Sequence, residues 1–173
     1  KLRILGIDPG TATMGYGVID CTYKKGGAKT PDSFVCIEYG CLTTNKDLPP
    51  GKRLHTLEKG LLRLISDYSP DIMGVETLFF FKNNKTVMAV SEARGVILLT
   101  AAKKKVEVYE FSPLQVKMTI TGYGRADKKQ LQQMIAETLT LSKIPKPDDA
   151  ADALGVAVTC SLAVLNPLFL RKK

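Results

Sequence analysis

Four carboxylates spread along the chain could do chemistry together: Asp8, Glu76, Asp149 and Asp152. Asp8 follows a segment that is apolar at Leu2, Ile4, Leu5 and Ile7, and Glu76 follows the apolar run 72–75, so each acid ends a sequence typical of a buried strand. A charge at such a position costs free energy unless it is paired or bound to a cation. If the two strands are neighbours, the four acids converge on one spot.

Oxygen ligands without His or Cys favour hard divalent cations, so the expected cofactor is Mg²⁺, with Mn²⁺ as a plausible substitute. Two such ions about 4 Å apart can activate a water and stabilise the leaving oxygen in the hydrolysis of a phosphodiester. The carboxylates therefore predict a metal-dependent nuclease.

The last two acids are three residues apart, which places them on one face of a helix. Their neighbours Ala150, Ala151 and Ala153 are small and leave that face free to approach a sheet. The alternative is that Asp148 and Asp149 only cap the helix N-terminus. Capping leaves Asp152 unexplained, because it lies inside an otherwise apolar segment.

The elements that must position these acids follow from hydrophobic periodicity. Strands are expected at 2–8, 14–23, 33–44, 71–76 and 106–111, the first three forming a meander. Helices are expected at 50–68, 83–105, 127–141 and 148–165, with a further short helix opening at Ser112-Pro113 and holding Lys117. The order βββαβαβαα predicts an α/β fold, with a five-stranded mixed sheet flanked by helices on both sides, in a single domain over 1–173.

The composition favours a polyanionic partner. The net charge is +8 and the pI about 9.3, although a merely basic soluble surface has the same signature. No apolar run of about 18 residues and no signal peptide is present, so we expect a cytoplasmic protein without a membrane partner. Cys21, Cys36, Cys41 and Cys160 lack metal-ligand spacing and are expected to be reduced core thiols.

Five segments together resemble the signature segments of RuvC-type Holliday junction resolvases, in the same order and over nearly the whole chain. They are Leu5-Gly6-Ile7-Asp8-Pro9-Gly10, Gly74-Val75-Glu76 followed by Phe79, Ala93-Arg94-Gly95, Gln115-Val116-Lys117, and Asp149-Ala150-Ala151-Asp152-Ala153-Leu154. The resemblance implies a ribonuclease-H-like fold and a homodimer that binds a four-way DNA junction. It further implies paired, symmetric nicks in two strands of like polarity, and motor proteins of branch migration as partners.

On the matching positions, the resemblance implies that Asp8, Glu76, Asp149 and Asp152 hold the metal ions. Asp149 is preferred to Asp148 because the family's acid pair is three residues apart and is followed by Ala-Leu. Lys117 and Lys128 also match, and a lysine near the scissile phosphate would stabilise charge in the transition state. The alternative for each lysine is a solvated position on a helix.

The aromatic run Phe79-Phe80-Phe81 follows the second acid-bearing strand directly. Three consecutive aromatics cannot all face one core, so at least one is available to stack on bases. Phe79 is the one that matches the family, and Phe79 and Lys82 are expected to contact DNA. The alternative is core packing, which is expected for one or two of the three rings.

Helix 83–105 is apolar on more than one side. One face is expected to pack on the sheet, while the other either meets a second subunit or is buried within the domain. The run Lys103-Lys104-Lys105 is expected to be a solvated helix end or a generic phosphate contact. His55 lies outside the matching segments and is expected on the surface.

Three other functions compete with a junction resolvase. Residues 8–12 are similar to the first phosphate loop of actin-like ATPases and sugar kinases, but 173 residues cannot hold the two domains that such enzymes need. A ribonuclease H, or another nuclease of this fold that acts on RNA or an RNA–DNA hybrid, differs in substrate more than in chemistry. A catalytically silent junction-binding protein would not need the full acid set.

Overall fold

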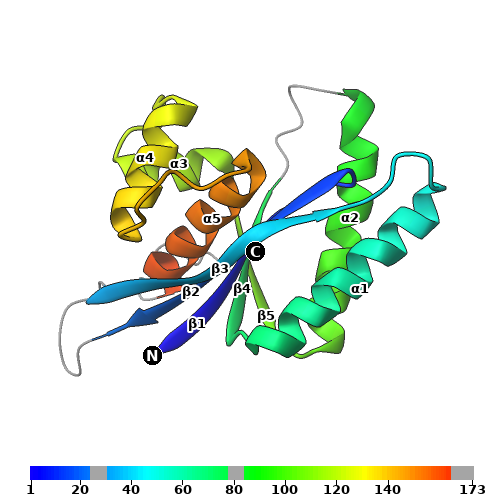
Figure 1. Ribbon diagram of the computed structural model, residues 1–173, viewed down its shortest axis with the longest axis horizontal. Coiled ribbons are helices and arrows are strands. Elements are labelled where there is room, and N and C mark those ends of the chain that lie inside the picture. Colours follow the sequence, from blue (N-terminus) through cyan, green and yellow to red (C-terminus); the bar gives the residue numbers. More distant parts are fainter. Residues whose placement is uncertain (24–30, 78–83, 165–173) are drawn as a thin grey trace.

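The computed structural model describes residues 1–23, 31–77 and 84–164 (Figure 1). Its strands are β1 (Leu2–Asp8), β2 (Thr13–Thr22), β3 (Ser33–Thr43), β4 (Ile72–Glu76) and β5 (Glu107–Phe111). Its helices are α1 (Pro50–Tyr68), α2 (Asn84–Lys103), α3 (Pro113–Thr121), α4 (Lys128–Thr138) and α5 (Asp148–Val164).

The strands form one sheet in the order β3-β2-β1-β4-β5. β1, β2 and β3 make the expected antiparallel meander, whereas β4 and β5 run parallel to β1 after crossovers through α1 and α2. The predicted five-stranded mixed sheet is therefore confirmed. Because β1, β4 and β5 are parallel, their carboxyl ends meet at one edge of the sheet, where open α/β sheets bind ligands.

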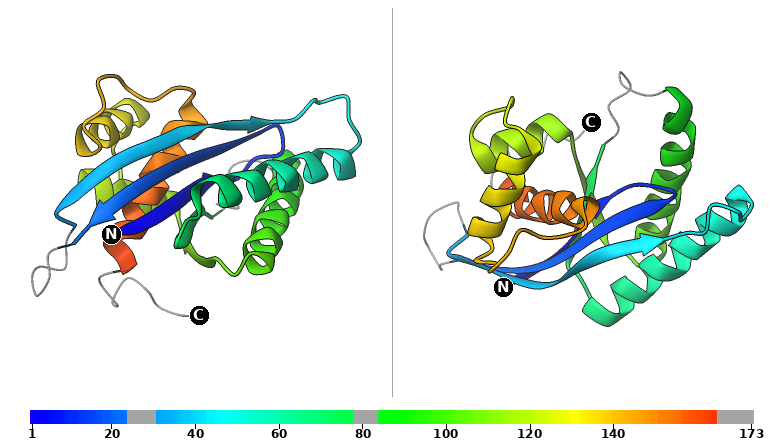
Figure 2. Two further views of the ribbon diagram at one scale, coloured as in Figure 1. Left: turned by 60° about the horizontal axis from the view of Figure 1, so that its bottom comes forward. Right: turned by 45° about the horizontal axis from the view of Figure 1, so that its top comes forward.

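Helices cover both faces of the sheet, as Figures 1 and 2 show from several directions. On one face, the strand residues Leu5 and Val18 share a buried cluster with Leu61 of α1 and Ile97 of α2. On the other face the strands pack with α5, behind which lie α3 and α4. Side chains alternate between the two faces along β1, so this central strand is apolar almost throughout.

The last third of the chain differs from the expected pattern. The segment that follows β5 is a full nine-residue helix, α3, so the order of elements is βββαβαβααα. Ser112 caps this helix in a capping box with Gln115, which is the local reason that it forms. α4 ends at Thr138 rather than at residue 141, because Thr140 adopts a left-handed conformation with φ of 53°. α2 ends at Lys103 for the same reason, since Lys105 has φ of 57°.

The structure also tests the expectations for the single histidine and for the cysteines. His55 is 60% exposed and faces Glu58. All four cysteines are free; Cys21 and Cys160 are buried, and Cys36 is half-buried and packs against the core, whereas Cys41 is half-buried outside it, so the prediction of core thiols is wrong for Cys41. Within the described ranges, no helix is both long and apolar enough to cross a membrane.

Candidate active site

Asp8 and Glu76 lie side by side at the carboxyl edge of the sheet. β1 and β4 are parallel neighbours in a register that pairs Ile7 with Val75, and each acid is the next residue of its strand. The condition on which the sequence argument rested, that the two acid-bearing strands are adjacent, is thus met.

The surroundings of both carboxyl groups disfavour their charged forms. Burial, reinforced by repulsion from Glu76, Asp152 and Asp149, raises the pKa of Asp8 to about 8. Burial and the charge of Asp152 raise the pKa of Glu76 to about 7, although a hydrogen bond with the Asp8 carboxyl opposes this rise. The edge therefore resists carrying all of its formal negative charge, and a cation bound there would relieve it.

Helix α5 brings the other two acids to the same edge by an unusually close approach to the sheet. A Cβ on Gly6 of β1 would collide with the carbonyl oxygen of Ala153, and one on Gly15 of β2 would collide with that of Asp149. Glycine on the strands and alanine on the helix let the two backbones touch. The small residues that were predicted to allow this approach do so.

Lys128, the first residue of α4, bridges two carboxylates of α5. Its Nζ lies 3.2 Å from Oδ2 of Asp152 and 3.3 Å from Oδ2 of Asp148. Burial alone would lower the pKa of Lys128, but these two acids outweigh it and raise the pKa. Burial dominates at Asp152, whose pKa is raised in spite of the lysine.

Asp148 and Asp149 face different surroundings. Asp148 forms a second ion pair, with Lys146 at 2.7 Å, and these cations lower its pKa. The charge of Asp149 acts instead on Asp8 and on Cys41 of β3. Asp149 is therefore the acid that interacts with the carboxylate of Asp8, whereas Asp148 forms ion pairs with Lys128 and Lys146 near the start of α5.

A cavity of about 220 Å³ opens beside these acids. It brings both predicted lysines together with two of the predicted acids, since its lining consists of Glu76, Pro113, Val116, Lys117, Lys128, Leu131 and Asp152. Lys117 comes from α3, and its positive charge lowers the pKa of Glu76. The cavity thus joins an acidic wall to two cations contributed by separate helices.

Four carboxylates are ligands of the kind that divalent metal ions prefer. In this structure, however, the described side chains are not arranged around a common metal position. In the part of the chain that the structure describes, no group of three or more His, Cys, Asp or Glu side chains is arranged so that it could hold a metal ion. The contact between Lys128 and Asp152 is one physical reason, because an ammonium group already compensates that carboxylate.

A buried acid elsewhere shows that burial alone does not make this site. Asp20 on β2 is only 4% exposed, yet hydrogen bonds from Arg3 and Lys1 lower its pKa to about 2. Asp8 has no such cationic partner within bonding distance among the described residues, and its nearest charges are other acids. Asp20 is therefore part of a structural ion pair, whereas Asp8 lies in a group of acids that a bound cation would stabilise.

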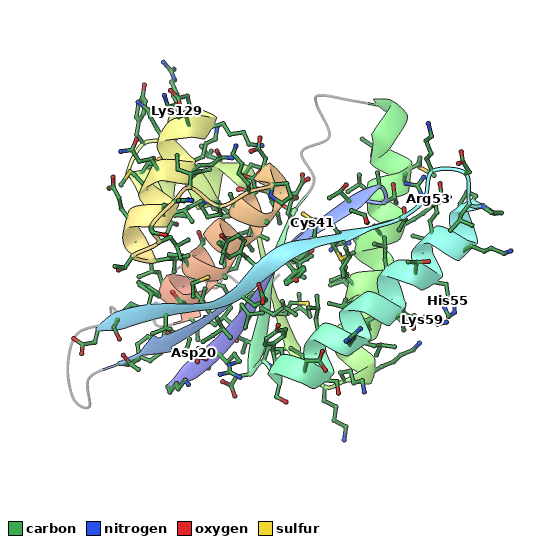
Figure 3. The ribbon with its side chains drawn as sticks, viewed as in Figure 1. Asp20, Cys41, Arg53, His55, Lys59 and Lys129 are labelled. Atoms are coloured by element: carbon green, nitrogen blue, oxygen red, sulfur yellow. The ribbon has the colours of Figure 1, made fainter. Side chains whose placement is uncertain are left out.

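Sequence reasoning missed several residues of the site. Gly15 and Gly17 alternate along β2 on the face where α5 lies, a spacing that signals close backbone approach. Cys41, labelled in Figure 3, accepts a hydrogen bond from the backbone of Ala150 at the start of α5. Nothing in the local sequence indicated this last contact. The predicted DNA contacts Phe79 and Lys82 lie outside the described residues, as do Phe80 and Phe81.

Comparison with known proteins matches residues 4–160 to the family described as "Crossover junction endodeoxyribonuclease RuvC". The protein of that name from Desulforamulus reducens is 52% identical over 155 residues, which cover 90% of each chain. The one from Caldicellulosiruptor saccharolyticus is 48% identical over 168 residues, which cover 97% of each. The solved structure "T. thermophilus RuvC in complex with Holliday junction substrate" superposes with a TM-score of 0.86 at 28% identity, over 95% of this chain and 96% of that one.

Proposed function

The chain belongs to the RuvC family of crossover junction endodeoxyribonucleases, and from this premise we propose that it resolves four-way DNA junctions by paired, symmetric nicks in strands of like polarity. Residues 1–173 act as one nuclease domain of ribonuclease-H-like fold. The observation that carries the proposal is the convergence of acids from β1, β4 and α5 at one edge of the sheet, beside a cavity that two lysines line.

The acids Asp8, Glu76, Asp149 and Asp152 would hold two Mg²⁺ ions, for which Mn²⁺ can substitute. Bound there, the ions supply a water of lowered pKa and stabilise the leaving oxygen of the phosphodiester. The raised pKa values of Asp8 and Glu76 support this assignment, because a divalent cation stabilises carboxylates whose charged form is disfavoured by burial and, to a lesser degree, by mutual repulsion. To join the site, the carboxylate of Asp152 has to leave Lys128.

The two lysines act on the phosphate. Lys117 and Lys128 line the cavity together with Glu76 and Asp152, so a phosphate that entered it would meet two positive charges. An ammonium group released from Asp152 can hydrogen-bond to a phosphoryl oxygen as negative charge develops there. We assign Lys128 this role at the reacting group and Lys117 a similar one from the opposite helix.

DNA is the favoured substrate because the relatives are named endodeoxyribonucleases and the Thermus protein was solved with a Holliday junction. The net charge of +8 suits a partner that carries many phosphates. Stacking by Phe79 and a phosphate contact by Lys82 remain predictions, as does assembly with branch-migration motors. A nuclease for RNA or RNA–DNA hybrids is the alternative that differs only in substrate.

A homodimer is supported by a stripe on α2 that the sheet does not cover. Met88 is 72% exposed and Leu99 is 56% exposed, whereas Ala93 and Ile97 on the other side of the helix are buried. Exposed Glu92, Gly95 and Ala102 complete the stripe with spacings of four and three residues, as in the contact seam of two packed helices. A Cβ at Gly95 would meet nothing within 4 Å, so a second backbone can approach there.

The dimer can be tested by light scattering on purified protein at micromolar concentration. We expect a dimer for the wild type and a monomer for Leu99→Glu, because a carboxylate would be buried in the seam. Met118→Glu is the matched control, since Met118 is 49% exposed on α3, away from α2. A dimeric Leu99→Glu variant would place the subunit contact elsewhere.

The nuclease function can be tested by incubating one labelled four-way junction, a linear duplex of the same sequence and an RNA–DNA hybrid with Mg²⁺. We expect the wild type to nick the junction in two symmetric positions and to leave the other two substrates largely intact. Asp8→Asn should bind the junction without cutting it. Equal cleavage of all three substrates would favour a general nuclease, and binding without cleavage by the wild type would favour a silent junction-binding protein.

A further inference from the structure

Arg53 on α1 is tied to the turn that follows the first catalytic strand. Its Nε donates a hydrogen bond of 2.9 Å to Oγ1 of Thr44, and that hydroxyl donates one of 2.6 Å to the carbonyl oxygen of Thr11. The backbone N–H of Thr44 also donates to the carbonyl oxygen of Ala12 at 3.0 Å. Three segments that are distant in sequence are thereby joined next to Asp8.

Among the described residues, no hydrogen bond is found to the two terminal amino groups of the Arg53 guanidinium. Most other arginines in the described parts of the chain bind a carboxylate: Arg3 binds Asp20, Arg63 binds Asp67 and Arg94 binds Glu110. No such partner is found for Arg53 among the described residues, although its side chain is half-buried and fixed by the bond to Thr44. A planar fork held in place at Nε is prepared to bind two oxygens of a phosphate.

The surroundings of Arg53 are basic. Lys52 directly precedes it and Lys46 lies seven residues earlier; both are exposed, and neither forms an ion pair within the described ranges. Asp47 is the single acid among residues 44–57, and the first turn of α1 carries no acidic residue. Figure 3 labels Arg53 at the end of the sheet where β3 leads into α1. The local charge therefore attracts an anion.

This corner lies close to the reacting group. Thr11 is three residues beyond Asp8, so their Cα atoms are separated by at most about 11 Å even in a fully extended chain. Consecutive phosphates on one DNA strand advance by about 3.4 Å along the helix axis. A strand with one phosphate at the acids thus has neighbouring phosphates within reach of Arg53.

We propose that Arg53, oriented by Thr44, binds a backbone phosphate that flanks the one being cut, and so fixes the register of the DNA strand against Asp8. The site is distinct from the cavity that Lys117 and Lys128 line on the α3–α4 side of the acids. The inference rests on the proposed function, because it requires a DNA substrate.

The test is the salt dependence of junction binding, measured without cleavage in the presence of Ca²⁺. Arg53→Ala should weaken binding about five- to tenfold near 0.1 M salt and lower the slope of log K against log salt by about 0.9, the value for one lost phosphate contact. Arg53→Lys should keep most of the slope but bind a few-fold more weakly, because it cannot reproduce the fork. Thr44→Val should also keep the slope while weakening binding, since it removes only the anchor.

Arg63→Ala is the matched control, because Arg63 lies on the same helix but is paired with Asp67 at 3.4 Å. It should leave affinity and slope unchanged. An unaltered slope and affinity for Arg53→Ala would overturn the inference, and an unaltered slope with a lower melting temperature would make Arg53 only a brace of the turn. Failure of the wild type to bind the junction at all would instead refute the proposed function, and this inference with it.

Discussion

Replacing Asp8 by Asn should stabilise the metal-free protein at alkaline pH, although it removes a residue of the active site. The folded-state pKa of Asp8 is raised from its ordinary value of 3.8 to about 8. A group with a raised folded pKa favours folding fully at pH values below its unfolded pKa, and this contribution is lost as the pH rises through the folded pKa. Between about pH 4 and pH 8, ionisation of Asp8 therefore makes the wild type progressively less stable.

The size of the effect follows from the same values. One pKa unit corresponds to about 1.4 kcal/mol, so ionising Asp8 in the folded protein costs on the order of 5 kcal/mol at high pH. Glu76 ionises over the same range and shares the repulsion, so a neutral Asn should recover about half, roughly 2–3 kcal/mol. At pH 5, Asp8 is protonated in the folded protein but already largely ionised in the unfolded chain, so the variant should be more stable by only about a third of this amount, roughly 1 kcal/mol.

Urea unfolding in EDTA at pH 5 and pH 8.5 measures this difference. Adding Mg²⁺ at pH 8.5 should stabilise the wild type and have little effect on Asp8→Asn. Asp20→Asn is the opposite control: the pKa of Asp20 is lowered to about 2 by Arg3 and Lys1, so its loss should destabilise the protein at both pH values. If Asp8→Asn is no more stable than the wild type at pH 8.5, the acids are not in mutual conflict and the argument for a cation site is refuted.

Two further changes test how the site is held and how it works. Gly15→Ala forces a methyl group onto the carbonyl oxygen of Asp149. We expect the free energy of unfolding in urea to fall by about 1–3 kcal/mol and junction cleavage to slow roughly 100-fold. Gly51→Ala is the control and should change neither quantity, because a Cβ there meets nothing within 4 Å. Lys128→Met should slow junction cleavage by about 100-fold. Titration with Mn²⁺ should show metal binding at least as tight as in the wild type, since the ammonium group that competes for Asp152 is gone. Lys129→Met, at an exposed position of α4, is the control, and weaker metal binding by Lys128→Met would contradict the assigned role.

The fold was largely predictable because its signals are local. The continuous apolar runs of β1 and β4, the helical spacing in α1 and the Ser69-Pro70 stop all lie within short windows of sequence. The positions of Asp8 and Glu76 followed from one topological rule, that parallel strands end at a common edge. The pairing of Lys128 with Asp152 could be suspected only through the family resemblance, since it joins two helices by a side-chain contact.

The sequence-based predictions were wrong where a single residue adopts an uncommon backbone conformation or contacts a residue far away in the sequence. The apolar residues Leu139 and Leu141 extend the helical pattern, but the left-handed Thr140 between them ends α4 earlier. Cys41 looked like a core thiol because its strand is apolar, yet it contacts the start of α5, more than a hundred residues away. Such contacts depend on packing that no short window of sequence contains.

The contact between α5 and the strand glycines has a consequence for engineering. Because the helix rests directly on Gly6 and Gly15, the separation between strand-borne and helix-borne acids is a property of main chain, and no choice of rotamer or conservative core swap can retune it. Helices α3 and α4 instead meet α5 through side-chain ends, since Val116, Ile120 and Ile135 close around Gly155, where an added Cβ would lie 2.9 to 3.3 Å from them. Attempts to broaden or narrow what this scaffold accepts should therefore vary that apolar layer, where lysines can be shifted by fractions of an ångström while the acid geometry stays fixed.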